Sequence, residues 1–166
     1  MSFIRLKTIN GARYAYEVEN YWTSKGSRQR TKQYLGRVYT PDETRSVPFT
    51  LSEQDLPAIA HALARHALAT HGFDQEGSTL VWNHIRADLT LGTFVAHDKS
   101  AVIELNEGFL CEQTYRALRT FTPSAERFEK QLATTLLAAG LTIPKDLFIH
   151  LFDAAKKRFK TNDTAQ

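Results

Sequence analysis

Residues 3–37, FIRLKTINGARYAYEVENYWTSKGSRQRTKQYLGR, determine the fold expected for the first part of the chain. Apolar and basic side chains alternate over residues 3–9, which is the period of a half-buried β-strand. The Asn10-Gly11 pair follows directly, and this pair readily accepts the positive φ angles of a tight hairpin turn. The stretch therefore predicts a β-hairpin at its start.

A second strand is expected over residues 13–22, which are rich in aromatic and β-branched side chains. Tyr14, Tyr16 and Val18 alternate along this strand and so share one face. A small sheet has to bury one of its faces, and these three side chains are expected to be in the core.

The chain then turns through residues 24–27 into a third strand at about residues 28–35. Arg28, Arg30 and Lys32 alternate along it and are expected on a single face. The three strands together predict an antiparallel meander with a basic face.

A break in composition follows the meander. Residues 41–49 contain Pro41 and Pro48 among polar residues, which is typical of a linker. The chain is therefore expected to divide into a basic β-meander, residues 1–40, and a larger lobe, residues 50–160.

The larger lobe mixes helical and strand patterns. Thr50 and Glu53 resemble a capping box, and apolar residues at helical spacing predict a helix over residues 51–71, with Pro57 near its first turn. Strands are also expected at 80–82, 89–96 and 101–105, with the last two paired as a hairpin. Helices are expected over 108–120, capped by Asn106, from Pro123 to Gly140, and from Pro144 onward. The predicted class is α+β, with a β-hairpin and about four helices in this lobe.

The charge distribution favours contact between the meander and a polyanion. Eight basic and two acidic side chains give residues 1–40 a net charge of +6, whereas the remaining 126 residues carry −3. A basic segment on a mildly acidic body is the electrostatic footprint expected of a nucleic-acid-binding surface.

Composition excludes several classes of protein. No stretch of about 18 to 20 apolar residues suits a membrane helix, and residues 1–7 lack the apolar core of a signal peptide, so a cytoplasmic protein without a membrane partner is expected. The single cysteine, Cys111, excludes an internal disulfide and cysteine-cluster metal sites, and is expected to be a buried, inert thiol.

The motifs of the common enzyme classes are missing from the chain: the P-loop, the dinucleotide fingerprint, the paired-histidine zinc motif and the nucleophile elbow. His61, His66 and His71 recur every five residues, so on a helix they point in different directions. A non-enzymatic protein is expected, with no cofactor, no catalytic residues and no metal site.

A minor alternative is a Mg²⁺-dependent nuclease that uses Asp88, Glu104 and Glu107, because carboxylates near the ends of paired strands can bind Mg²⁺. Leu105 and Asn106 follow Glu104, so the lysine that completes the common restriction-type site is missing. These carboxylates are therefore expected to be structural.

The candidate nucleic-acid contacts are basic side chains of the meander together with one tyrosine. Cations neutralise phosphates, and aromatic rings offer flat surfaces to bases or sugars. The candidates are Arg5, Lys7, Arg13, Lys25, Arg28, Arg30, Lys32, Tyr34 and Arg37.

Five short runs carry a further signal: Phe3-Ile4-Arg5, Gly11, residues 14–19, Arg28-Gln29-Arg30 and Tyr34-Leu35-Gly36. In these runs the segment resembles the β-hairpin DNA-binding region of insertion-sequence transposases, and its small basic sheet is similar in outline to the arm-binding domain of tyrosine integrases. The resemblance covers about 36 of the 166 residues and implies DNA binding by Arg5, Arg28, Arg30 and Tyr34. The rest of the chain is too short for a transposase catalytic core and has no matching acidic triad. The whole chain resembles small uncharacterised archaeal or candidate-phylum proteins that join such a hairpin to a helical region.

The function expected from the sequence is nucleic-acid binding through the basic β-sheet, with DNA favoured over RNA by the resemblance alone. The alternative is a protein-interaction or assembly module in which the C-terminal helices bind a partner. Homo-oligomer formation is left open.

Overall fold

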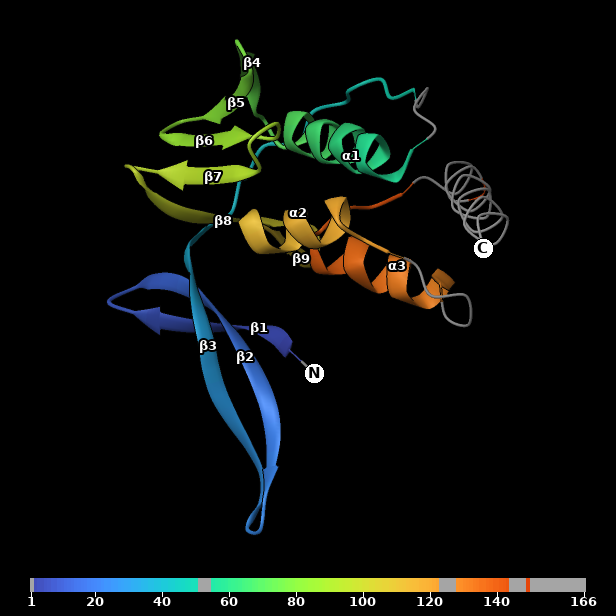
Figure 1. Ribbon diagram of the computed structural model, residues 1–166. Helices are drawn as coiled ribbons and strands as arrows, with labels where there is room; N and C mark the ends of the chain where they lie inside the picture. Colours follow the sequence, from blue (N-terminus) through green and yellow to red (C-terminus); the bar gives the residue numbers. More distant parts are fainter. Residues whose placement is uncertain (1, 51–54, 123–127, 144–148, 150–166) are drawn as a thin grey trace.

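The computed structural model describes residues 2–50, 55–122, 128–143 and 149, and has the expected α+β class (Figure 1). The N-terminal strands are β1 (Ser2–Ile9), β2 (Ala12–Thr23) and β3 (Gly26–Tyr39). The remaining elements are α1 (Leu56–Thr70), β4 (Asp74–Glu76), β5 (Thr79–Trp82), β6 (Ile85–Asp88), β7 (Thr93–Ala96), β8 (Lys99–Leu105), β9 (Gly108–Leu110), α2 (Glu112–Arg119) and α3 (Phe128–Ala138).

Strands β1, β2 and β3 pair antiparallel, as the sequence predicts. Asn10 and Gly11 form the first turn with φ angles of 49° and 77°, which are the positive values that favour these two residues. Strand β1 covers β2 only as far as Glu19, so the outer ends of β2 and β3 continue as a two-stranded ribbon. Figure 1 shows this ribbon projecting away from the body of the protein, and we call it the arm, residues 20–29.

Strand β3 is longer than expected, because its last residues pair with a second part of the chain. Arg37 to Tyr39 run parallel to Ala101 to Ile103 of β8, which joins the meander to the other strands in the order β1-β2-β3-β8-β7-β6-β5-β4. Gly36 makes this contact possible: its φ is 139°, and a β-carbon there would collide with the backbone of Ser100.

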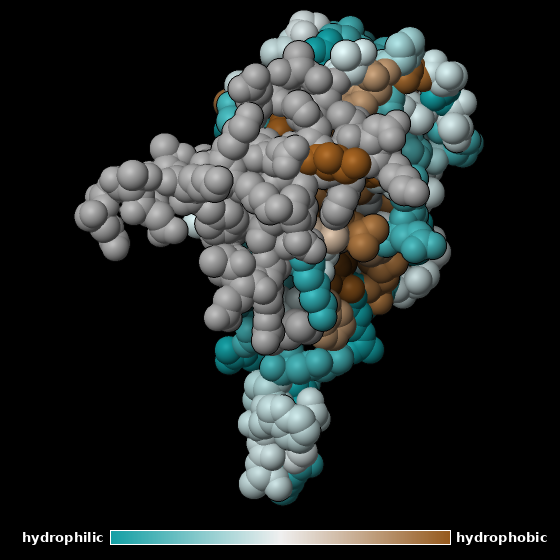
Figure 2. All heavy atoms as spheres, turned by 90° about the vertical axis from the view of Figure 1, so that its right-hand side faces the viewer, coloured by the Kyte–Doolittle hydropathy of each residue, from teal (hydrophilic) through white to brown (hydrophobic). Residues whose placement is uncertain are grey.

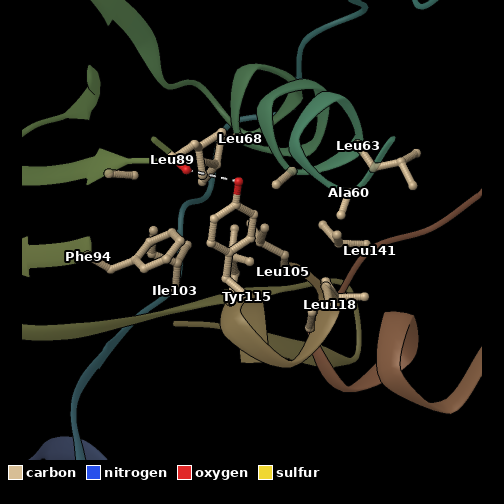
Figure 3. Close-up of a cluster of buried hydrophobic side chains, with 14 of the residues drawn as sticks. Ala60, Leu63, Leu68, Leu89, Phe94, Ile103, Leu105, Tyr115, Leu118 and Leu141 are labelled. Atoms are coloured by element: carbon tan, nitrogen blue, oxygen red, sulfur yellow. Dashed lines mark hydrogen bonds between the residues drawn. The ribbon is translucent and has the colours of Figure 1, made fainter. Parts of the chain in front are cut away.

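The main core lies between β5–β8 and the three helices (Figure 3). Tyr115 of α2 is fully buried at its centre, and its hydroxyl donates a hydrogen bond of 3.0 Å to the carbonyl oxygen of Leu89. Leu132 and Leu136 of α3 are buried, and Gly140 follows the end of that helix with a φ of 69°. This core contains no buried residue of the meander.

Three of the expected elements are wrong in detail. The strand expected over 89–96 begins only at Thr93, as β7, because the residues before it form the turn that follows β6. Asp88 holds this turn by accepting hydrogen bonds from the backbone N–H groups of Thr90 and Leu91. The helix expected over 108–120 begins only at Glu112. Asn106, with a φ of 50°, belongs to the β8–β9 turn, and Cys111 is the N-cap of α2.

The helix expected from residue 51 begins at Leu56, where Asp55 is the N-cap and accepts a hydrogen bond of 2.9 Å from the backbone N–H of Ala58. The Thr50–Glu53 cap involves residues 51–54, which lie outside the described residues. Strands β4, β6 and β9 were not expected. The first turn expected after Pro123 and the helix expected from Pro144 also fall outside the described residues.

Candidate nucleic-acid interface

The N-terminal sheet has two chemically different faces, which follow from the alternation of side chains along β1 and β2. One face, the inner face, contains Ile4 and Leu6 of β1 and Ala15 of β2. These pack in a second, smaller core with Leu35, Val38, Val102 and Cys111. The opposite face, the outer face, carries Arg5, Lys7, Tyr14, Tyr16 and Tyr34.

The expectation that Tyr14 and Tyr16 are core residues is wrong. Ala15 between them is completely buried, so the two tyrosines, which alternate with it, are half-buried on the outer face. Val18 is buried as expected, at 2% exposure. The small core needs a small residue at position 15, because β2 there packs closely against the rest of the protein.

Three tyrosines cluster on the outer face. The ring of Tyr34 lies 5.3 Å from that of Tyr16 and 6.4 Å from that of Tyr14, measured between centroids. Tyr34 is the most exposed of the three, at 48%. Partial burial beside the other two rings raises the pKa of its hydroxyl above its ordinary value.

Basic side chains flank this cluster. The Nζ atom of Lys7 lies 4.8 Å from the centroid of the Tyr16 ring, and Arg5 donates a hydrogen bond of 2.8 Å to the side chain of Gln29. Residues 1–40 contain only two carboxylates, Glu17 and Glu19, and both alternate onto the inner face. The strands β1–β3 therefore present cations and aromatic rings, but no acidic side chain, on the outer face.

The mixed aromatic and basic surface continues past the meander. The guanidinium of Arg37, which pairs across the sheet with Tyr14, lies 5.4 Å from the Tyr39 ring. Tyr39 contacts His84 at 5.4 Å, and His84 stacks on His97 at 4.2 Å, in each case between ring centroids. The two histidines lie in the turns before β6 and before β8. Sequence reasoning missed them because their proximity depends on how β5–β8 pair.

Arg28 and Arg30 pair across the sheet with Tyr21 and Glu19, so the face expected to be basic is the inner face, opposite the tyrosine cluster, and it is not purely basic. Arg30 forms an ion pair with Glu19, and Lys32 lies 3.0 Å from a carboxylate oxygen of Glu17. These pairs arise because β3 has one unpaired residue at Lys32 and another at Leu35, which are β-bulges that shift the register against β2. A carboxylate beside each cation offsets much of the attraction that it would have for phosphate.

Three other candidates lie in different surroundings. Lys25 and Arg28 are exposed near the tip of the arm, and within the described part of the chain neither forms a salt bridge. Arg13 reaches β8 instead: it donates hydrogen bonds of 2.5 and 3.2 Å to Glu104. Thr40 also donates to Glu104, at 2.7 Å.

Glu104 is thus the acceptor in an ion pair that joins β2 to β8. The hydrogen bond from Arg13 holds the pKa of the Glu104 carboxyl below its ordinary value. Asp88 binds two backbone N–H groups in its own turn, and Glu107 is exposed in the β8–β9 turn. Among the residues that the structure describes, no three His, Cys, Asp or Glu side chains are grouped to hold a metal ion.

An apolar groove of about 540 Å³ lies elsewhere, between β1, β9, α2 and α3. Its walls include Ile4, Phe109, Ala117 and Ala138. Figure 2 shows apolar side chains on the side of the body above the arm, whereas the arm itself is coloured neutral to hydrophilic. No helix in the described ranges has the length and apolar character needed to cross a membrane.

Comparisons with protein-family models, with curated proteins and with solved structures found no match to this chain.

Proposed function

We propose that this protein binds nucleic acid through the outer face of its N-terminal sheet. The observation that carries the proposal is the combination on one face of Arg5 and Lys7 with the cluster around Tyr34, on strands whose only two carboxylates face the other way. Cations attract phosphates, and aromatic rings stack on bases whatever the sequence.

The candidate contacts contribute unequally in this proposal. Arg5, Lys7 and Arg37 on the outer face, with Lys25 near the arm tip, supply the charge that reaches phosphate. Arg28 pairs across the arm with Tyr21 on the inner face and contributes less. The cations paired with carboxylates, Arg13, Arg30 and Lys32, contribute less. DNA is the favoured ligand on the transposase resemblance, and the protein acts without catalysing a reaction.

The test measures the affinity for labelled single-stranded DNA, single-stranded RNA and duplex DNA by fluorescence anisotropy at several salt concentrations. The double variant Arg5→Gln/Lys7→Gln should weaken binding and flatten the slope of log K against log salt by about 0.7 to 0.9 for each phosphate that the variant no longer neutralises. The matched control is Arg65→Gln/Lys130→Gln, which removes the same charge from exposed positions on α1 and α3.

The control should bind within about twofold of the unmodified protein, because local charge on the sheet matters more than net charge. Equal effects of both double variants would contradict the proposed interface. No binding to any of the three nucleic acids would contradict the function itself.

The protein-interaction alternative is supported by a separate observation, the apolar groove beside α2 and α3. This groove lies against the helices that the alternative uses, and it does not involve the outer-face tyrosines. The protein-interaction function would be favoured if the protein bound no nucleic acid and if the variant Ala117→Glu sedimented differently from the unmodified protein.

A further inference from the structure

The outer face does not end at the tyrosine cluster but continues along the arm. Side chains at every second position of β2 share this face, so Tyr16, Val18, Asn20 and Trp22 follow one another toward the tip. Trp22 is six positions after Tyr16, which is about 20 Å along a strand. The arm thus places an indole ring about 20 Å from the Tyr34 cluster, on the same side of the sheet.

Trp22 has no structural role that the fold explains. Its side chain is 83% exposed, and within the described residues it takes part in no ring–ring or cation–π contact. Its neighbour Tyr21 faces the other way and lies under Arg30, 5.8 Å from the guanidinium carbon. A large aromatic side chain left in water gains free energy when a flat partner covers it.

We infer that the ligand of the outer face is a single strand of nucleic acid, which lies along β2 from Tyr34 to Trp22 and stacks bases on these two rings. The inference rests on the proposed function and names the substrate class of the same site. Bases of a single strand are free to stack on side chains, whereas those of a duplex are already stacked on one another.

The charge pattern favours a single strand over a duplex. A ribbon inserted into a groove of duplex DNA has a phosphate backbone along both walls. On the inner face, Arg30 and Lys32 are already paired with Glu19 and Glu17, so among the described residues of the ribbon mainly Arg28 would remain to meet the wall on that side. A single strand on the outer face instead meets Arg5 and Lys7 without passing a carboxylate of β1–β3.

The distance also sets the length of strand required. At about 3.4 Å per stacked nucleotide, 20 Å corresponds to about six nucleotides. A four-nucleotide oligomer therefore cannot reach both rings when stacked, and a twelve-nucleotide oligomer reaches both with nucleotides to spare.

The experiment titrates the full chain with oligothymidylates of 4 and 12 nucleotides, a 12-nucleotide oligouridylate and a 12-base-pair duplex, following tryptophan fluorescence and anisotropy. Trp22→Ala removes the ring, Trp22→Phe keeps a ring but removes the indole signal, and Tyr21→Ala is the matched control on the opposite face. The second tryptophan, Trp82, is partly buried beside Phe73 and serves as an internal reference.

The 12-nucleotide single strands should quench the unmodified protein and bind at least tenfold more tightly than the 4-nucleotide strand or the duplex. Trp22→Ala should weaken binding about tenfold, Trp22→Phe should bind within about threefold but lose most of the quenching, and Tyr21→Ala should stay within about twofold. The two single-stranded 12-mers distinguish DNA from RNA as the source of the strand.

Two results would overturn the inference while leaving the proposed function standing. One is single-strand binding that Trp22→Ala does not change, and the other is tighter binding of the duplex than of the 12-mers. Failure to bind any of the four ligands would instead reject the proposed function. Trp22 is exposed at the end of the arm, so circular dichroism should show the same folded signal for each variant.

Discussion

At the scale of single residues, ion pairs between residues that are separated in the sequence determine which cations are paired and which are not. Arg13 and Glu104 are 91 positions apart, and their ion pair makes Arg13 part of the joint between β2 and β8. Glu17 and Glu19 similarly pair with Lys32 and Arg30. A count of basic residues in the first 40 positions cannot separate these paired cations from the unpaired ones.

Glu104→Gln tests the role of this pair. Because the Glu104 pKa is lowered on folding, its charge stabilises the folded state above its ordinary value of 4.5, and this contribution is lost as the pH falls through the lower folded value. At pH 7 the variant should lose about 1 kcal/mol in urea unfolding. The difference from the unmodified protein should shrink below about pH 4.

The control is Glu112→Gln, which removes a carboxylate paired with Arg116 on the exposed side of α2 and should change stability by less than about 0.5 kcal/mol. Glu104→Gln also bears on the nuclease alternative. We expect no cleavage of DNA or RNA with Mg²⁺ or Mn²⁺ by either protein. Metal-dependent cutting that disappears in Glu104→Gln would show that this carboxylate is catalytic.

At the scale of elements, the joint between β3 and β8 depends on one close backbone approach. The two strands share only three paired positions, and Gly36 lies just before them, against the backbone of Ser100. The turn glycines Gly11 and Gly26 also have positive φ, but a β-carbon there would meet open space. The same residue type therefore has two different reasons for its presence in one sheet.

Gly36→Ala separates these two reasons. It combines an unfavourable φ with a collision against β8, so it should cost about 3 kcal/mol or more in the free energy of unfolding. Gly26→Ala, with a φ of 103° and free space, should cost only about 1 to 2 kcal/mol. Chemical denaturation measures both, and equal losses would mean that the β3–β8 approach is not tightly packed.

At the scale of the whole molecule, two cores of unequal size lie on either side of β8. The main core takes Ala101, Ile103 and Leu105, and the smaller core takes Val102. All buried residues of the main core come from residue 56 onward. The meander is attached through the smaller core, the short parallel pairing and the Arg13–Glu104 pair.

A fragment that starts at Phe49 should therefore fold, because it keeps every buried residue of the main core and loses only the partly buried Tyr39 beside it. It should lose nucleic-acid binding with the meander. It should be less stable than the full chain by on the order of 3 kcal/mol, since Val102 and Cys111 become exposed and β8 gains an open edge. Circular dichroism, thermal unfolding and gel filtration test this. An unfolded fragment would mean that meander and lobe form one folding unit.

The sequence alone determined the features that depend on neighbouring residues. Period-two patterns, the Asn10-Gly11 turn, the apolar spacing of α1 and α3 and the glycine at the end of α3 are local matters of backbone sterics and side-chain alternation. The chain could be divided into strands and helices on this basis. The predicted ends of the elements were wrong where a side chain such as Asp88 forms a turn by binding backbone N–H groups.

Only the tertiary structure decided which face of the meander is buried. Alternation along β2 separates Tyr14 and Tyr16 from Ala15, but it does not say which set turns inward. That choice depends on the packing of Val102 and Cys111, more than 80 residues away, which accept the small Ala15 in the smaller core and leave the tyrosines on the outer face. The physical reason is that contacts between distant segments form only when the whole chain closes on itself, so no short stretch of sequence specifies them.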